Sequence, residues 1–170
     1  MRTRTVAAIA ITLTVLILAI LATSYSFLRS GGLSARKKPG NLEHSVAAHA
    51  LDLSIPMSAK SAKNPIPPTP EAVTAGMKSF TENCFVCHGS DGAGRTETAK
   101  GFSPAVPDLR TPHVQKLTDG QMFYLIKNGI RFTGMPAWNL SEEQIWKLVL
   151  VMRQFAKEPV SVQSRNRAHR

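Results

Sequence analysis

The chain has 170 residues and a formal net charge of +10, from 21 Lys and Arg against 11 Asp and Glu. This length allows one ordinary domain with extensions, and it excludes a large α/β barrel or two full-size catalytic domains. Hydrophobic residues make up 43% of the chain, but aromatic residues only 6%. In a small domain with so few aromatic side chains, a cofactor can help to fill the core.

The positive charge lies in the flanks of the chain. Residues 1–70 contain eight basic and two acidic residues, and residues 158–170 contain three basic residues and one acidic residue. Residues 71–157 contain ten basic and eight acidic residues and are therefore almost neutral. Because a nucleic-acid-binding protein normally has its basic surface on the folded domain, this distribution argues against nucleic acid as a partner.

Residues 1–28 contain an apolar run, Val6 to Ala22, that only two threonines interrupt. With its continuation to Leu28, the run is long enough for a helix to span the hydrocarbon core of a bilayer. Its length favours a retained transmembrane anchor, although Ala22-Thr23-Ser24 also fits a signal-peptide cleavage site. Basic residues are more numerous after the run than before it, which slightly opposes an external C-terminus.

Residues 29–70 are predicted to form a flexible, Pro-rich tether. They begin near Gly31-Gly32, continue through sequence rich in Ala, Ser and Lys, and end in Asn64-Pro65-Ile66-Pro67-Pro68-Thr69-Pro70. A short helix over residues 43–51 is compatible with this composition. A tether of this length suits a membrane-held domain that must reach its partners.

The folded domain is predicted to span residues 71–157, with its first helix beginning at Pro70. Proline suits the first position of a helix, and Thr69 before it is a candidate N-cap. One face of this helix is apolar at steps of four residues, which are Ala72, Gly76 and Phe80.

The two cysteines lie in the sequence Cys84-Phe85-Val86-Cys87-His88. Two thiols at this spacing can each form a thioether with one vinyl group of the same porphyrin, and His88 would then be an axial ligand of the iron. A thioredoxin-like pair would lie near a βαβ pattern, which is missing here. A structural zinc would need further ligands, of which His113 could supply one. The motif therefore predicts one covalently attached haem c and leaves no cysteine for a disulfide.

Residues 88–117 are rich in Gly and Pro and show no alternating β pattern. A loop of this length is uncommon in a compact domain unless it surrounds a large bound group. A ligating imidazole usually donates its second N–H to a carbonyl or carboxylate oxygen. The carbonyl of Pro107 is the favoured acceptor for His88, and that of Pro104 is the alternative.

Two more helices are predicted after this loop, each opened by a capping box. One begins at Thr118 to Gln121 and ends at Gly129, and the other begins at Ser141 to Gln144 and ends before Pro159. Apolar residues recur in both at three- and four-residue steps. The domain is therefore predicted to be all-α, and residues 158–170 are predicted to be a disordered basic tail.

The loop between these two helices contains Thr133-Gly134-Met135-Pro136. A haem that shuttles electrons needs a second axial ligand, and a thioether sulfur favours Fe(II) and raises the reduction potential. Met135 is favoured because Gly134 allows close approach of the backbone and Pro136 stiffens the turn. The other internal methionines lie in predicted helices or in the tether, and His113 is the main alternative.

Cys84 to Gly94 and residues 127–138 together resemble a class I monohaem cytochrome c of the bacterial, membrane-anchored type. The resemblance covers about residues 71–157. It implies the small, all-α cytochrome c fold with a long haem-wrapping loop, preceded here by an N-terminal transmembrane helix. It also implies haem attachment outside the cytoplasmic membrane, which outweighs the distribution of basic residues near the anchor. Val151 departs from the family, in which many relatives have Tyr.

Three further side chains are candidates for the surroundings of the haem. Trp138 could pack against the haem or only close the core. Arg131 and Arg110 could each pair with a haem propionate or point to solvent.

These residues predict a one-electron carrier and not an enzyme, because iron held by His88 and Met135 has no open position for a substrate. The partners would be a redox protein donor and acceptor, and the protein would act as a monomer or as a fixed subunit of an oxidase or dehydrogenase complex. The domain is expected at the periplasmic face of the cytoplasmic membrane, or in the periplasm if the apolar run is cleaved. A haem-based sensor or peroxidatic protein with a labile Met ligand is the alternative.

Overall fold

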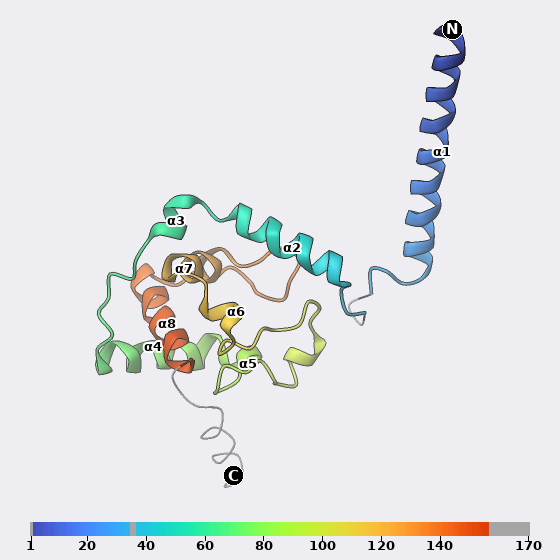
Figure 1. The fold of residues 1–170 in the computed structure, drawn as a ribbon. Helices are drawn as coiled ribbons and strands as arrows, with labels where there is room; N and C mark the ends of the chain where they lie inside the picture. The colour runs from blue at the N-terminus through green and yellow to red at the C-terminus, as the bar shows by residue number, and fades with distance from the viewer. Residues whose placement is uncertain (1, 35–36, 157–170) are drawn as a thin grey trace. The chain divides into compact units, whose positions relative to one another are not determined.

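A computed structural model describes residues 2–34 and 37–156 of the chain (Figure 1). The chain divides into two compact units, residues 1–37 and 38–170. Every regular element in the described ranges is a helix, and no strand occurs there. The prediction of an all-α fold is confirmed. The predicted basic tail over residues 158–170 lies outside the described residues.

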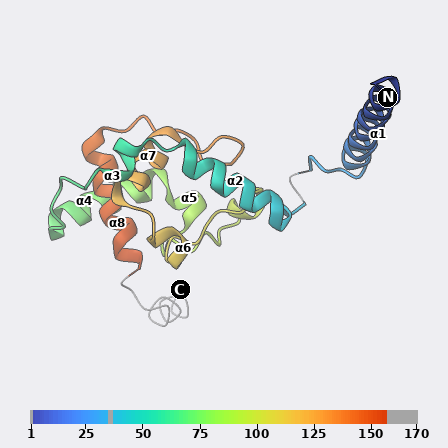
Figure 2. The same ribbon diagram turned by 45° about the horizontal axis from the view of Figure 1, so that its top comes forward.

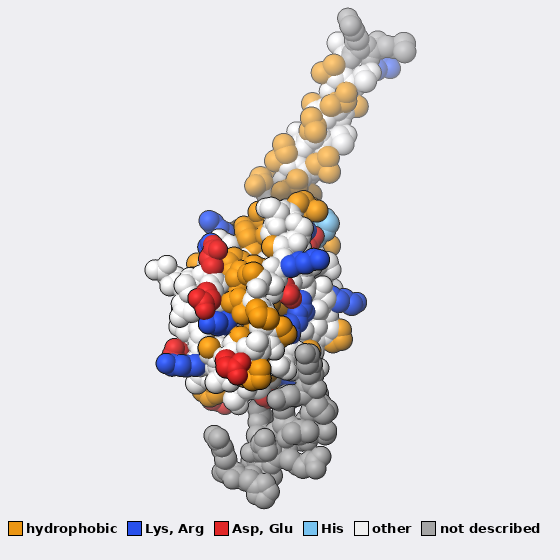
Figure 3. Space-filling view, turned by 90° about the vertical axis from the view of Figure 1, so that its left-hand side faces the viewer, with side chains coloured by type: hydrophobic (Ala, Val, Ile, Leu, Met, Phe, Trp, Pro, Cys, Tyr) orange, Lys and Arg blue, Asp and Glu red, His pale blue; other side chains and the backbone are white. Residues whose placement is uncertain are grey.

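Helix α1 (Arg2–Arg29) forms the first unit. Its segment Thr3–Arg29 is long and apolar enough to cross a membrane, and its described side chains are exposed. Figure 3 shows apolar side chains along this helix on the face in view. The helix is consistent with the predicted transmembrane anchor, and a signal sequence near the N-terminus can pass the same test of length and composition.

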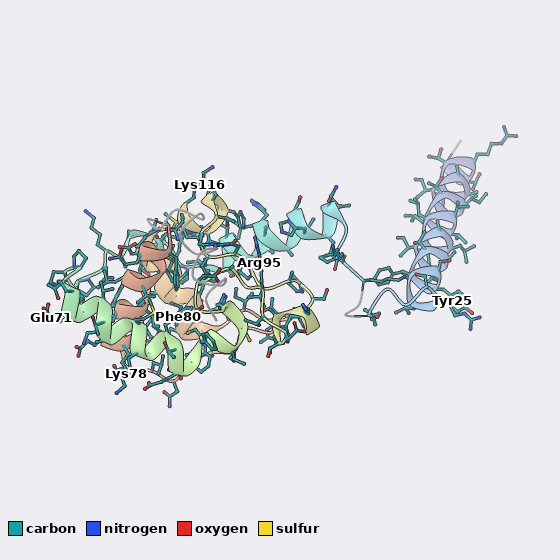
Figure 4. The ribbon with its side chains drawn as sticks, turned by 90° about the horizontal axis from the view of Figure 1, so that it is seen from below. Tyr25, Glu71, Lys78, Phe80, Arg95 and Lys116 are labelled. Carbon is teal, nitrogen blue, oxygen red and sulfur yellow. The ribbon has the colours of Figure 1, made fainter. Side chains whose placement is uncertain are left out.

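The core of the second unit lies where α4 (Pro70–Asn83) and α8 (Glu142–Phe155) pack against each other (Figure 2). Gly76 makes this approach possible, since a Cβ there would collide with the Lys147 carbonyl oxygen. Phe80 projects from α4 into the core, whereas Glu71 and Lys78 of the same helix point outward (Figure 4). Its ring lies 5.0 Å from that of Phe155 in an edge-on arrangement.

The predicted helix starts are confirmed. The Thr69 side chain accepts a hydrogen bond from the backbone N–H of Ala72, as an N-cap does. Helix α7 (Asp119–Asn128) and helix α8 both begin with a complete capping box, at Thr118 and Ser141 respectively. Gly129 ends α7 with a positive φ of 68°, a conformation that glycine adopts without strain.

The long segment between α4 and α7 contains only short helices. They are α5 (Phe85–His88), the 3-10 turn η1 (Ala99–Gly101) and α6 (Pro112–Gln115). Two buried side chains, Leu109 and Val114, join this segment to the same hydrophobic core as α4, α7 and α8.

The segment before α4 differs from a tether that is flexible throughout residues 29–70. Helix α2 (Asn41–Ser54) includes the short helix that the sequence allows, and α3 (Met57–Ser61) packs against α7. Ile55 between them is 3% exposed. Two features of α7 accept the segment: Gly120 leaves room for the Ala59 carbonyl, and Gln121 donates a hydrogen bond to Asp52.

The end of this segment is tied to α8. The side-chain amide of Asn64 donates to the Trp146 carbonyl at 2.9 Å and accepts from the backbone N–H of Ile66 at 3.0 Å. The Thr118 hydroxyl also donates to the Lys60 carbonyl at 2.9 Å. Residues 52–66 therefore belong to the packed part of the second unit.

Candidate haem-binding site

The two cysteines lie at either side of a tight corner after α4. Cys84 ends α4 and Cys87 lies within α5, one helical turn later, and both thiols are free. Burial, and then the neighbouring Cys87, raise the pKa of Cys84 to about 11. Phe85 and Val86, which lie between the two cysteines, have exposed side chains. The corner presents two unpaired thiols beside an open apolar edge.

The imidazole of His88 follows directly in the last position of α5. Burial lowers the pKa of the imidazole by disfavouring its charged form, and a hydrogen bond with the Pro107 backbone opposes this shift. Its Nδ1 atom is buried and makes no hydrogen bond of ordinary geometry. The Phe80 ring lies 6.5 Å from the imidazole, measured between centroids. A neutral, partly enclosed imidazole is the form of histidine that binds a metal.

Backbone hydrogen bonds fold the long segment back onto α5. The N–H of Gly94 donates to the His88 carbonyl, and that of Leu109 donates to the Gly92 carbonyl, both at 2.8 Å. The Thr96 hydroxyl lies 2.8 Å from the Val86 carbonyl oxygen. These contacts bring Pro107 to the imidazole although it is nineteen positions away in the sequence.

Arg110 holds the same segment together. Its side chain is 10% exposed, and its guanidinium donates two hydrogen bonds to the Asp108 carboxylate, at 2.8 and 2.7 Å. It also lies 3.6 Å from the Asp91 carboxylate. These contacts lower the pKa of Asp108, with the Arg110 hydrogen bond as the main cause. From the sequence, Arg110 could either pair with a haem propionate or point to solvent. In the structure, its guanidinium has two carboxylate partners, Asp108 and Asp91.

Met135 lies on a loop that hydrogen bonds constrain at both ends. Its N–H donates to the Thr133 hydroxyl, and its carbonyl accepts from the Ile130 N–H, both at 3.1 Å. Met135 and Trp138 are partly buried against the hydrophobic core, as Cys84 is. The Phe102 ring lies where a Cβ on Gly134 would have to be. The long segment therefore contacts the Met135 loop at Gly134.

The other candidate ligands are placed differently. Met122 is 1% exposed in the core, and Met77 and Met152 pack against that core from helices. His113 is exposed on α6. Arg131 is also exposed, with its guanidinium 5.9 Å from the centroid of the Phe132 ring. The pairing of Arg131 with a propionate stays a prediction.

The residues at the corner fit a haem better than they fit a zinc ion or a disulfide. Cys84 and Cys87 are not bonded to each other. In residues 2–34 and 37–156, no three His, Cys, Asp or Glu side chains converge as a metal site would require. Two free thiols, a partly buried imidazole directly after them and an apolar rim are groups that suit a covalently bound porphyrin.

Comparison with known proteins agrees with this chemistry. Residues 71–150 match the family model of cytochrome c oxidase, cbb3-type, subunit III. The match supports a c-type cytochrome domain in this part of the chain. This domain implies haem c and suggests electron transfer. No curated protein matches the chain significantly.

A solved structure supports the fold of the cytochrome domain. A chain of the reducing HAO-like protein complex of Kuenenia stuttgartiensis is 24% identical, with a TM-score of 0.50. The match covers 54% of this chain and 46% of that chain, so the alignment spans less than half of its length. At this identity the likeness shows the fold alone.

Sequence reasoning missed three side chains around the cytochrome site. They are Thr96, Phe102 and Asp108, the last of which pairs with Arg110. All three lie in the Gly- and Pro-rich segment of residues 88–117. A Thr or Asp in a Gly- and Pro-rich loop has many possible partners, and no local pattern selects one of them. Arg110 carried a weak signal, since Asp108 lies only two positions before it in the sequence.

Proposed function

We propose that the protein is a class I monohaem cytochrome c that carries one electron at a time, with haem attached to Cys84 and Cys87 and with His88 and Met135 as iron ligands. The corner formed by Cys84, Cys87 and His88 is the observation on which the proposal rests. Its thiols are free, and its imidazole is partly buried, with the Pro107 carbonyl beside it. When bound, the haem would supply an Fe(II)/Fe(III) couple.

Each residue has a separate task in this proposal. The Pro107 carbonyl accepts a hydrogen bond from the Nδ1–H of His88, which keeps the proton on Nδ1 and leaves Nε2 for the iron. Met135 supplies the soft second ligand from a loop that Phe102 contacts. The exposed Phe85 and Val86 form the apolar surface at which a redox partner docks. Because the domain is almost neutral, docking depends only modestly on salt.

The proposal places the domain on the periplasmic side of the cytoplasmic membrane, with α1 retained as an anchor. Two observations support it: α1 is long enough to span a bilayer, and the domain carries a haem attachment motif. The matched family model describes an oxidase subunit, which makes fixed membership of such a complex the alternative to a mobile carrier. Retention of an oxidase or dehydrogenase on gentle detergent extraction would favour the fixed subunit.

The thioethers and the Met ligand can be tested in one set of variants, matured in cells that attach haem c. The parent should keep its haem through denaturing electrophoresis and give a pyridine haemochrome spectrum typical of two thioethers, and Cys84→Ser with Cys87→Ser should lose both. Met135→Ala should lower the reduction potential and allow the reduced protein to bind carbon monoxide. Met77→Ala is the matched control, since Met77 also packs partly buried against the core, and its spectrum should not change.

The same set separates the competing functions. Haem retention by the double cysteine variant would contradict thioether attachment. Carbon monoxide binding by the reduced parent would favour a sensor or peroxidatic protein with a labile Met ligand. An unchanged spectrum in Met135→Ala would assign the sixth position to another residue.

A further inference from the structure

Helix α2 has almost no packing partner within its unit. The side chains of residues 41–50 are all exposed, Leu51 is only partly covered, and no residue of α2 is buried. Its N-cap is Gly40, which has no side chain that could cap the first turn. An isolated helix of this length is marginal in water, because nucleation is unfavourable and its propensity contributes little. Something outside the unit is therefore needed to stabilise α2.

One face of α2 is an unpartnered apolar stripe. Leu42, Val46 and Leu53 are 79%, 60% and 70% exposed, and steps of four and seven residues place them on one side of the helix. Met57, at the start of α3, is 76% exposed and continues the same spacing. The opposite side differs, because it leads to Ile55, which is buried in the second unit. At its C-terminal end, one side of the helix thus faces its own domain. The apolar side is exposed.

The covalent connection brings this stripe close to a bilayer. α1 ends at Arg29 and α2 begins at Asn41. The chain between them can span at most about 40 Å when fully extended. A turn shortens it, since the N–H groups of Gly31 and Ser34 donate to carbonyls three residues earlier. If α1 spans a membrane, α2 cannot leave the vicinity of that membrane.

The charges in the connection match a surface of anionic phospholipids. Arg29, Arg36, Lys37 and Lys38 lie between the apolar segment and α2, and no acidic residue lies among them. Basic residues next to a membrane span are attracted to anionic headgroups, and apolar side chains of an interfacial helix enter the boundary between headgroups and acyl chains. A protein partner would explain the stripe but not the basic cluster beside the anchor.

We infer that α2 lies on the surface of the membrane that holds α1, with Leu42, Val46 and Leu53 inserted among anionic phospholipids. This inference rests on the retained anchor of the proposed function and not on the iron ligands. Because residues 52–66 pack onto α7 and α8, it also holds the cytochrome domain near the bilayer. The redox partner would then be one that lies in the membrane or at its surface.

Cysteine alkylation of the full haem-loaded chain in vesicles containing phosphatidylglycerol tests this inference. Val46→Cys and Ala48→Cys place a thiol on opposite sides of α2, and both positions are exposed in the protein alone. A water-soluble maleimide should label the thiol at position 46 roughly tenfold or more slowly than that at position 48, because the bilayer covers only one side. Equal rates at the two positions would overturn the inference. Protection that disappears when each vesicle holds a single protein copy would also overturn it, and would assign the stripe to a second copy.

Two controls keep this result separate from the proposed function. The parent chain has only Cys84 and Cys87, so labelling of the parent would show that thioethers had not formed, whatever happens at α2. Mass spectrometry of the mature protein shows whether α1 is retained, and its loss would overturn the inference directly. Hydrogen exchange of the unmodified chain requires no variant: amides of residues 41–54 should exchange slowly in these vesicles, and fast exchange would contradict the inference.

Discussion

Residues 70–156 and residues 41–66 both form helices, but different interactions stabilise them. In the first region, α4, α7 and α8 bury their apolar faces against one another and share one core. In the second region, α2 is exposed over most of its length and only its end, with α3 and the following residues, touches the core helices. The helices of the first region pack against one another, whereas the second region packs only where it reaches the surfaces of α7 and α8.

This difference shows why a helix can form in a segment that looks like a linker. Residues 52–66 have no sustained helical period, yet Ile55 is buried and Asn64 reaches the backbone of α8. The partner surfaces on α7 and α8 come from distant parts of the sequence. The boundary of the packed part therefore lies nearer residue 52 than residue 71. We propose that the stable domain starts near residue 52.

The largest effect is expected at the crossing of α4 and α8. In Gly76→Ala, the new methyl group would meet the Lys147 carbonyl oxygen and a methyl group of Val151, so the two helices must separate. Such overpacking costs about 1–3 kcal/mol or more, against a gain of about 1 kcal/mol from replacing glycine inside a helix. We expect a net loss of about 2 kcal/mol, measured as a lower denaturant midpoint of the full chain in detergent.

Gly101→Ala is the matched control for this variant. No atom lies within 4 Å of a Cβ at Gly101, so the midpoint should not fall. A midpoint of Gly76→Ala equal to that of the control would show that the helices do not cross there, and the contrast between the two regions would disappear.

A smaller effect is expected where residues 52–66 meet the core. Ile55→Ala removes a buried side chain, and substitutions of this kind cost about 2–5 kcal/mol in a complete core. Because Ile55 lies at the edge of the core, we expect about 1.5 kcal/mol. Leu53→Ala, in the same segment but 70% exposed, should leave the free energy of unfolding in detergent unchanged. If both variants were as stable as the parent, the result would support the original prediction of a flexible tether.

The sequence was sufficient for the parts of the fold that depend on local patterns. Thr69, Thr118 and Ser141 all begin helices as predicted, because a capping side chain acts within three residues of itself. Cys84, Cys87 and His88 also lie within about one helical turn, and the attachment of haem to them stays a prediction. The Pro107 carbonyl lies near the His88 imidazole, and its role as the acceptor for a ligating imidazole stays a prediction.

The parts that could not be predicted depend on contacts between distant residues. The Phe102 ring lies over Gly134, thirty-two positions later, and nothing in either local sequence indicates this contact. Gln121 was read only as part of a capping box, but its side chain also donates to Asp52. A single sequence has no information about such pairs, because any exposed carboxylate or apolar surface of suitable shape would satisfy them.

The smallest effect is expected in the long segment between α4 and α7, where the ion pair of Asp108 with Arg110 adds to the core contacts of Leu109 and Val114. The pKa of Asp108 is lower in the folded protein, chiefly because Arg110 donates to it. Its stabilisation is therefore fully present above the unfolded pKa of about 3.9 and is lost as the pH falls through the lower, folded pKa. We expect Asp108→Asn to cost about 1 kcal/mol at pH 7, and the difference from the parent to shrink steadily below about pH 4.

Glu143→Gln provides the contrast that makes this measurement decisive. Lys147 also lowers the pKa of Glu143, but the Glu143 side chain is 69% exposed, so water screens the pair and its loss should not change stability measurably at any pH. Asp108 differs because Arg110, at 10% exposure, is shielded and has a second carboxylate, Asp91, beside it. If denaturant midpoints of both variants followed the parent from pH 7 to pH 3, the segment that contacts the Met135 loop would owe its order to Leu109 and Val114 alone, as a core element does.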